Sequence, residues 1–259
     1  MAGMRQIIAQ HRNVFTPSLY ARLRTVWFGD LPWGARLADQ ACVERWFTAG
    51  PEAKARFDKL CDDEFGAAVR ALSPANYPVK GLSDADIAAP FVEEIYGPGG
   101  VDEVGRVKTA LSMMILLDQI PRNLYRSKET LRIVYEHYDR IALSLARHVS
   151  TATPRLDLHP SIRLSQPFRQ WFYLPLMHSE DLEDHRLFSR ILEGLAEEGR
   201  DDPDVVKSVE DSIKFEKLHV AILERFGRYP HRNACLGRDF TDEERKWLDE
   251  GGQRFGVAS

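Results

Sequence analysis

The sequence predicts an all-α protein, built as a single domain of antiparallel helical hairpins. Apolar residues recur at spacings of three, four and seven in several long segments, which is the pattern of helices with one buried face. Residues that favour helix starts and stops stand at the ends of these segments. No segment sustains the alternation of apolar and polar residues that marks a strand.

Residues 1–16 are predicted to be a flexible N-terminal tail, and residues 17–259 to form the helical domain. The tail contains Arg5 and Arg12, and no acidic residue precedes Asp30. Such a basic start is found in organellar presequences, but residues 1–15 lack a clear amphipathic stripe. We therefore expect a frayed terminus.

The first long helix is expected to begin at Pro51, because proline is favoured in the first turn of a helix. Apolar residues follow it at helical spacing as far as Leu72. The same spacing predicts a second helix over residues 131–149.

Residues 182–195 form a third apolar stripe, which Gly199 is expected to close. The fourth helix is expected to open at Asp202-Pro203, a capping residue followed by proline, and to end at Gly227. Thr241-Asp242-Glu243-Glu244 has the form of a capping box and predicts a short last helix.

Two segments rich in proline, with glycine abundant in the first, interrupt the helical pattern, at residues 73–105 and 150–167. Both are expected to be loop insertions. Neither is expected to be a domain boundary, because the helices on both sides carry the polar segments described next. Long loops inside one domain often act as lids or binding loops.

Composition excludes several partners. The net charge of −4 gives no basic footprint for nucleic acid, and the interleaving of acidic and basic residues argues against an anionic-membrane stripe. The longest apolar run, residues 111–117, is too short to cross a bilayer. The 3 cysteines form no CxxC pair, so a zinc ribbon is excluded and a reducing, cytoplasmic setting is favoured.

Three polar segments lie within apolar helical sequence, at residues 117–126, 178–181 and 225–233. Burying ionisable groups costs several kcal/mol unless each group is paired. We therefore expect the three segments to meet in one semi-buried place. That place is either a binding site or a purely structural network of ion pairs.

The first segment supplies Asp118, Arg122 and Asn123, which we expect to support the ligand-contacting residues. Pro121 is expected to end or kink a helix that is apolar on all sides. Arg122 and Arg126 would then neutralise helix-end carbonyl groups, with Asp118 paired to one of them. This structural role and a ligand role are both open.

The second segment supplies His178, Glu180 and Asp181. Ser179 is expected to cap the next helix, which would place Glu180 and Asp181 in its first turn. His178 is a candidate catalytic acid or base held by Glu180 or Asp181. A metal site is not expected, because the di-iron bundle pattern is only half matched. The residues expected to form the apolar wall of the site are Trp27, Trp171 and Tyr173.

The third segment places Arg228, His231, Arg232 and Asn233 directly after Gly227. Two guanidinium groups and an imidazole on a loop make a receptor for carboxylate or phosphate. They would serve equally as counter-ions of the acids in the other segments. More cationic donors stand here than capping requires, so we expect the ligand contacts here, with His231 also a catalytic candidate.

The polar segments resemble the hallmarks of the family catalogued as domain of unknown function 924. Residues 116–126, 172–184 and 225–238 match its patterns LLDQFPRNxxR, FxYLPLxHSEDLxxQ and RFGRFPHRNxxLGR, and residues 26–29 and 45–47 are similar to its FWFG and RWF signatures. The resemblance implies an all-helical fold similar to tetratricopeptide repeats. It implies no established activity.

The chain departs from the family pattern in three places. The segment 73–105 is longer than its family counterpart, and His185 stands where the family generally has Gln. The insertion around residues 151–162 also looks enlarged. Remodelled loops over a retained pocket would suit a changed substrate.

We therefore predict a cofactor-independent protein with an Arg/His-lined pocket for a small organic molecule. Hydrolysis, proton transfer and cyclisation are the reactions considered, and catalysis itself is left open. The alternatives are a tetratricopeptide-like adaptor, which predicts an open groove, and a purely structural ion network. Homo-oligomerisation is also left open.

Overall fold

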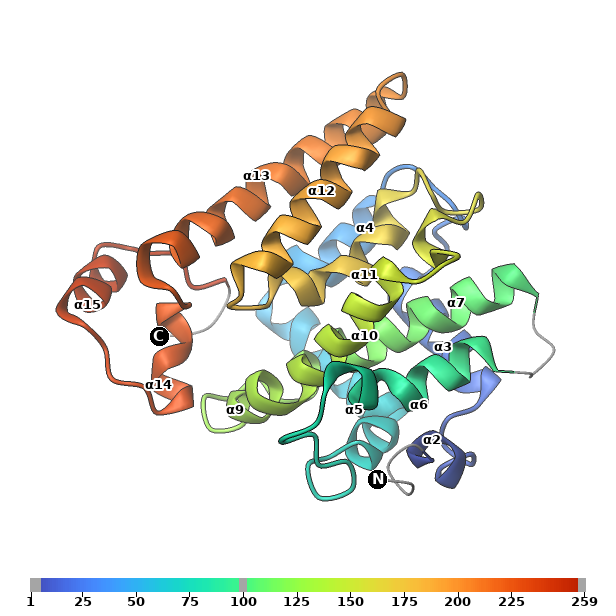
Figure 1. Ribbon diagram of the computed structural model, residues 1–259, viewed down its shortest axis with the longest axis horizontal. Coiled ribbons are helices and arrows are strands. Elements are labelled where there is room, and N and C mark those ends of the chain that lie inside the picture. The colour runs from blue at the N-terminus through green and yellow to red at the C-terminus, as the bar shows by residue number, and fades with distance from the viewer. Residues whose placement is uncertain (1–5, 98–101, 256–259) are drawn as a thin grey trace.

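All regular structure is helical in the computed structural model, which describes residues 6–97 and 102–255 (Figure 1). Those two ranges contain no strand, so the all-α prediction is confirmed. The α-helices are α2 (Ile7–Gln10), α3 (Pro17–Phe28), α4 (Gln40–Val43), α5 (Pro51–Ala71), α6 (Asp84–Tyr96), α7 (Glu103–Met114), α8 (Ile120–Leu124), α9 (Leu131–Ile133), α10 (Asp139–Thr151), α11 (Gln166–Met177), α12 (Leu182–Glu198), α13 (Pro203–Phe226), α14 (Asn233–Leu236) and α15 (Asp242–Asp249).

Shorter turns of other helical types join these elements. Three are π-helical, with one extra residue per turn: η1 (Glu44–Thr48), η2 (Ile115–Gln119) and η3 (Val134–Tyr138). Two are 3₁₀ turns: η4 (Leu156–Leu158) and η5 (Pro230–Arg232). All three of these π-helical turns and η5 border the cavity described below.

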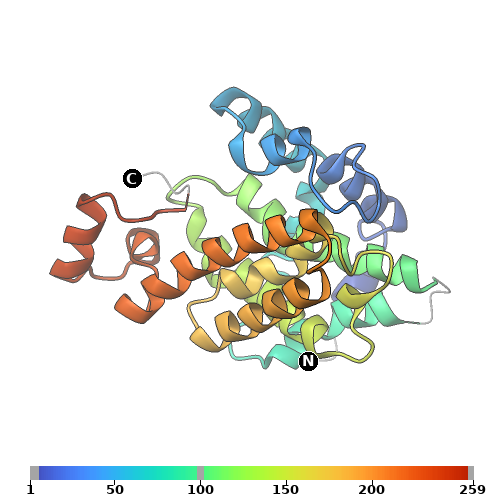
Figure 2. The ribbon, with the colours of Figure 1, turned by 90° about the horizontal axis from the view of Figure 1, so that it is seen from above.

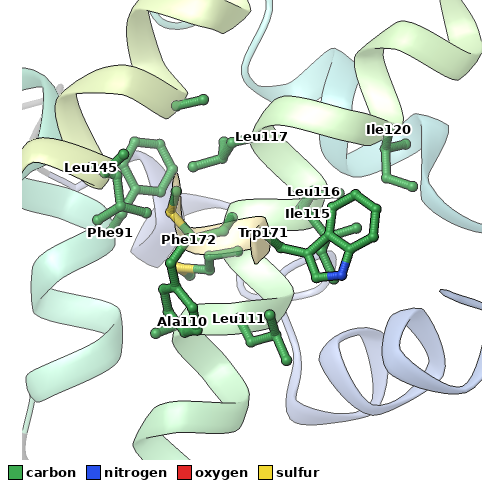
Figure 3. Packing of buried hydrophobic residues seen from close by; sticks show 14 of the residues in the cluster. Phe91, Ala110, Leu111, Ile115, Leu116, Leu117, Ile120, Leu145, Trp171 and Phe172 are labelled. Atoms are coloured by element: carbon green, nitrogen blue, oxygen red, sulfur yellow. The ribbon is translucent and has the colours of Figure 1, made fainter. Parts of the chain in front are cut away.

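The core is built around α7 and η2. α7 packs against α3, α6 and α11. Its residues Ala110 and Leu111, and Ile115 in η2, are completely buried, together with Phe172 from α11 (Figure 3). The expectation of a helix that is apolar on all sides holds here.

Consecutive helices form antiparallel neighbours in the C-terminal half. α12 and α13 lie side by side in both views (Figures 1 and 2), and α11 packs against α10 and α12. The N-terminal half is different, because α3 packs against α7, α5 against α8, and α6 against α10. The likeness to tetratricopeptide repeats stays a prediction.

The prediction of a flexible tail is wrong for residues 6–16. Helix α2 packs against α6, and Ile7, Ile8 and Phe15 are at most 3% exposed. A helix of one turn is too short to show an amphipathic stripe in the sequence, so its buried residues were not recognised. Residues 1–5 lie outside the described ranges.

The prediction of a loop over residues 73–105 holds for residues 73–83, which contain no helix, and is wrong for residues 84–96 and 103–105. The segment contains α6 and the start of α7. Pro90 is one of the prolines that favour a loop in the sequence, but it lies inside α6, where Ile87, Phe91 and Ile95 form a buried face at a spacing of four. That face outweighs the one backbone hydrogen bond that proline removes.

Residues 152–165, between α10 and α11, hold only the 3₁₀ turn η4. The segment is anchored rather than free to act as a lid. Asp157 is completely buried, and its carboxylate accepts hydrogen bonds from Arg155, Arg169 and the Tyr173 hydroxyl.

Candidate functional site

A cavity of about 560 Å³ lies between α11, α13, the turns η1 and η2, and the C-terminal segment. Aromatic rings form most of its wall: Trp46, Phe47, Tyr135, Phe188, Phe215, Tyr229 and Phe255. Its polar lining is Gln119, Arg122, Gln166, Gln170, His178, Asp211, Ser212, His219, His231 and Arg232. We call it the aromatic cavity.

The aromatic cavity has an exposed end and a buried end. Phe47 is 62% exposed and Phe215 is 42% exposed. Tyr229, His231 and Arg232 are at most 9% exposed. An incoming molecule would therefore meet apolar rings first and charge last.

The turn η2 carries Asp118 into the interior. α7 ends at Met114, η2 follows, and α8 begins at Ile120 with Pro121 in its first turn. The predicted break at Pro121 falls just after the π-helical turn, and Pro121 stands in the first turn of α8, where its missing N–H is not needed. Asp118, within the π-helical turn, is 1% exposed.

The Asp118 carboxylate holds His178, which ends α11. His178 Nδ1 lies 2.9 Å from Asp118 Oδ1. The pKa of His178 is lowered by burial and then by the charge of Arg122. A neutral imidazole beside a carboxylate donates from Nδ1, so Nε2 carries the lone pair. No described residue hydrogen-bonds Nε2.

Arg122 completes this group of charges. Its guanidinium binds Asp139 through two hydrogen bonds of 2.6 and 3.0 Å, and it lies 3.3 Å from Asp118 Oδ1. It also donates to the Asp118 carbonyl, as the helix-end reading predicted. Burial raises the pKa of Asp118, but His178, Arg122 and the hydrogen bond from Gln119 together bring it below the usual value.

Arg232 is a buried cation, 8% exposed, that forms no ion pair with any described residue, although its charge helps to lower the pKa of Glu180. Its guanidinium lies over the rings of Tyr135 and Tyr229, at 4.5 and 4.7 Å, and its Nε has no hydrogen-bond partner. Cation–π contacts of this kind contribute about 2 kcal/mol, less than the cost of burying the charge unpaired.

His231 and His219 are neutral neighbours at the same end. The pKa of each is lowered to about 3, mainly by burial, with a smaller contribution from the charge of Arg232. His219 Nδ1 lies 2.9 Å from the carbonyl oxygen of Phe215, and its ring stacks on Phe255. His231 Nδ1 is buried with no hydrogen-bond partner among the described residues.

A second cavity, of about 280 Å³, adjoins the first. The two share Tyr135, His178 and Arg232. Its other lining is largely charged and includes Glu136, Asp139, Arg140, Glu180 and Arg238. His178 and Arg232 therefore border an aromatic space and a charged space at once. We call the second space the charged cavity.

Glu180 and Asp181 do not hold His178, contrary to prediction. Glu180 pairs with Arg238 and accepts a hydrogen bond from the backbone N–H of Tyr229. Asp181, rather than Ser179, caps α12, and its side chain is 56% exposed. The N-cap of α12 therefore lies two residues later than expected, and neither Glu180 nor Asp181 forms a hydrogen bond or ion pair with His178.

Arg228 and Asn233 also lie away from the aromatic cavity. Arg228 binds Glu244 through hydrogen bonds of 2.7 and 2.9 Å, and Asn233 donates to the same carboxylate at 3.2 Å. Glu244 completes the predicted capping box with Thr241 at the start of α15. These two predicted contacts are therefore structural.

The predicted apolar wall is likewise corrected. Trp27 and Trp171 pack edge to face behind Trp46, and Tyr173 hydrogen-bonds Asp157. Asn123, expected in a supporting position, contacts Cys61 and accepts from Arg126. None of these four predicted residues lines the aromatic cavity.

Most aromatic residues of the cavity wall could not be identified from the sequence. Trp46 and Phe47 stand in the RWF signature, but the sequence alone assigns these two residues no role. Tyr135, Phe215 and Phe255 looked like ordinary helical or terminal residues. The exposure of Phe47 and Phe215 depends on tertiary packing, so periodicity could not reveal it.

Two features are absent from the described residues. No group of three or more His, Cys, Asp or Glu residues there could hold a metal ion. No helix there is both long and apolar enough to cross a membrane.

Comparison with known proteins identifies the family. No curated protein matches the chain. A solved structure of a protein of unknown function from Agrobacterium tumefaciens is similar to it, with 26% identity and a TM-score of 0.53, over 90% of this chain and 98% of that one. The family model described as bacterial protein of unknown function (DUF924) matches residues 23–252. The resemblance seen in the sequence is thereby confirmed, and the chain belongs to this family.

Proposed function

We propose that the protein binds a small organic anion with an apolar body and transforms it without a cofactor. The observation that carries this proposal is Arg232, a buried guanidinium at the closed end of the aromatic cavity that forms no ion pair with a described residue. An anionic group of a ligand would supply the missing partner. The aromatic rings would cover the apolar body.

His178 is the proposed general base. Its Nε2 lone pair accepts no hydrogen bond from a described residue, and its lowered pKa keeps the imidazole neutral near pH 7. Proton uptake at Nε2 would form an imidazolium beside the Asp118 carboxylate at 2.9 Å. Asp118 would stabilise that cation and fix the ring's orientation, as the acid does in a Ser-His-Asp triad.

The two cavities favour hydrolysis or proton transfer over cyclisation. A ligand body in the aromatic cavity leaves the charged cavity open to water on the other side of His178. Water entering there would give its proton to Nε2 and direct its oxygen at the bound molecule. A carbon acid would instead lose its own proton to Nε2.

An adaptor function is the second candidate. Phe47, Phe215 and Leu218 are 62%, 42% and 50% exposed, and exposed apolar side chains can anchor a peptide. The convergence of Arg232, His178 and Arg122 on one enclosed end favours the small-molecule proposal. A peptide in an open groove would not need them.

Fluorescence titration with 8-anilinonaphthalene-1-sulfonate tests the anion site, because this probe joins an apolar body to one negative charge. We expect saturable binding that Arg232→Gln weakens at least tenfold. Arg186→Gln, on the exposed face of α12, is the matched control and should not alter it. Equal affinity in the wild type and in Arg232→Gln would refute the proposed anchor.

Catalysis is tested separately with a panel of mono-nitrophenyl esters of apolar dicarboxylic acids, which retain one carboxylate for Arg232. Turnover should be lost in His178→Gln while the probe still binds. If the probe binds but the wild type turns over none of the esters, the hydrolase proposal is rejected and only the binding pocket remains supported. Capture of apolar peptides, blocked by Phe47→Ala but not by Arg232→Gln, would favour the adaptor.

A further inference from the structure

A third hollow, of about 340 Å³, lies at the end of the molecule formed by α14, α15 and the C-terminal segment. α14 and α15 lie beyond the end of α13 in both views (Figures 1 and 2). The hollow is lined by Lys128, Arg245 and Arg254, with Asp249 as its single carboxylate. It shares only His231 with the aromatic cavity. We call it the cationic hollow.

The three cations of this hollow have no acidic partner in the described part of the chain. Arg245 lies over the ring of Phe240 at 5.2 Å, and Arg254 donates to the Leu248 carbonyl oxygen at 3.2 Å. Arg245, Arg254 and Lys128 form no ion pair with any residue of 6–97 or 102–255. Nearby arginines behave differently, since Arg225 binds Glu243.

His231 adds a donor from the interior side. Its Nδ1 is buried and has no hydrogen-bond partner among the described residues, and the residue is 9% exposed. An unpaired buried polar atom costs about 1–3 kcal/mol. An acceptor oxygen bound in the hollow would satisfy this atom if Nδ1 carries the hydrogen.

We propose that the cationic hollow binds a phosphate group, either free or as a monoester. Three cations against Asp249 leave a net positive charge, which suits a dianion. The guanidinium groups of Arg245 and Arg254 offer forked N–H donors, and Lys128 adds a point charge. A volume of about 340 Å³ exceeds the needs of one phosphate and leaves room for an attached group.

The site is distinct from the proposed anion site in the aromatic cavity. Arg232 lines the aromatic and charged cavities but not this hollow. The walls differ as well, because neither Phe47 nor Phe215 lines this hollow. The phosphate proposal therefore stands or falls independently of the function proposed above.

Isothermal titration calorimetry with inorganic phosphate, at constant ionic strength, tests the proposal. We expect saturable binding to the full chain, weakened at least tenfold in the double variant Arg245→Gln/Arg254→Gln. Asp249→Asn should tighten binding, since it removes the only repulsive charge. Arg186→Gln and Asp201→Asn, on exposed surface elsewhere, are the matched controls and should leave binding unchanged.

A second titration with phenyl phosphate identifies the source of the group. Tighter binding than inorganic phosphate, with the same loss in the double variant, points to a monoester; equal affinity points to free phosphate. Absence of saturable heat with both ligands overturns the proposal. So does an unchanged affinity in the double variant, provided that its thermal unfolding matches that of the wild type.

Discussion

His178 Nδ1 and Asp118 Oδ1 lie 2.9 Å apart, although the two residues are 60 positions apart in the chain. The contact joins the end of α11 to the π-helical turn η2. Because Asp118 is 1% exposed, its carboxylate has exchanged water for His178, Gln119 and Arg122. The pair therefore links a buried charge network to the wall of two cavities.

Replacement of Asp118 should destabilise the fold and release His178. We expect Asp118→Ala to lower the free energy of unfolding by about 3 kcal/mol, near the low end for breaking a buried pair, because Arg122 keeps Asp139. Asp118→Asn should cost less, since it retains an acceptor. Urea unfolding measures both. Asp211→Ala, exposed beside the cavity, is the control and should stay within about 0.5 kcal/mol of wild type.

Arg228→Ala should lower the stability of the fold without changing ligand affinity. The change leaves the Glu244 carboxylate, which is 1% exposed, without its main partner. We expect a loss of about 1–3 kcal/mol in the free energy of unfolding. Affinity for 8-anilinonaphthalene-1-sulfonate should not change, because Arg228 does not line the aromatic cavity. A loss of probe binding in a folded Arg228→Ala protein would contradict this division.

Local signals predicted helix ends well. Asp202 caps α13, Gly227 ends it in the left-handed conformation, and Thr241 and Glu244 form a capping box. Each depends on neighbouring residues alone, so a single sequence suffices. Pro90 shows the limit of such signals, because its tolerance inside α6 depends on packing against α10.

The candidate site was predicted less completely. His178, His231, Arg122 and Arg232 do line the aromatic cavity. The acid that holds His178 could not be chosen from the sequence, because chain proximity favoured Glu180 and tertiary packing selected Asp118. The expected surplus of cations after Gly227 proved to be Arg232, since Arg228 binds Glu244.

The cysteines should differ sharply in reactivity. Cys42 and Cys61 are completely buried, and burial raises the pKa of the first to about 11 and of the second to about 12. Cys235 is half-buried. At pH 8 we expect 5,5′-dithiobis-(2-nitrobenzoate) to label Cys235 alone in the folded protein and all thiols in urea. Labelling that persists in folded Cys235→Ser would contradict the burial of the other two.

Acid should destabilise the protein through its buried neutral histidines. Burial lowers the pKa of His219 and His231 to about 3, whereas an unfolded histidine titrates near pH 6.5. Between those values the unfolded chain binds the extra proton, so stability is complete above pH 6.5 and falls as the pH drops toward 3. Each histidine contributes a slope of up to about 1.4 kcal/mol per pH unit.

His231→Gln isolates one of these two contributions. Urea unfolding of the wild type and the variant at pH 7, 6, 5 and 4 should show their difference in unfolding free energy shifting in favour of the variant as the pH falls. The expected change in that difference is about 1 kcal/mol per unit below pH 6. His148→Gln, which replaces a half-buried histidine at the end of α10, is the control. A pH-independent difference for His231→Gln would mean that His231 is protonated to the same extent in the folded and unfolded protein, and would remove it as a neutral donor to the cationic hollow.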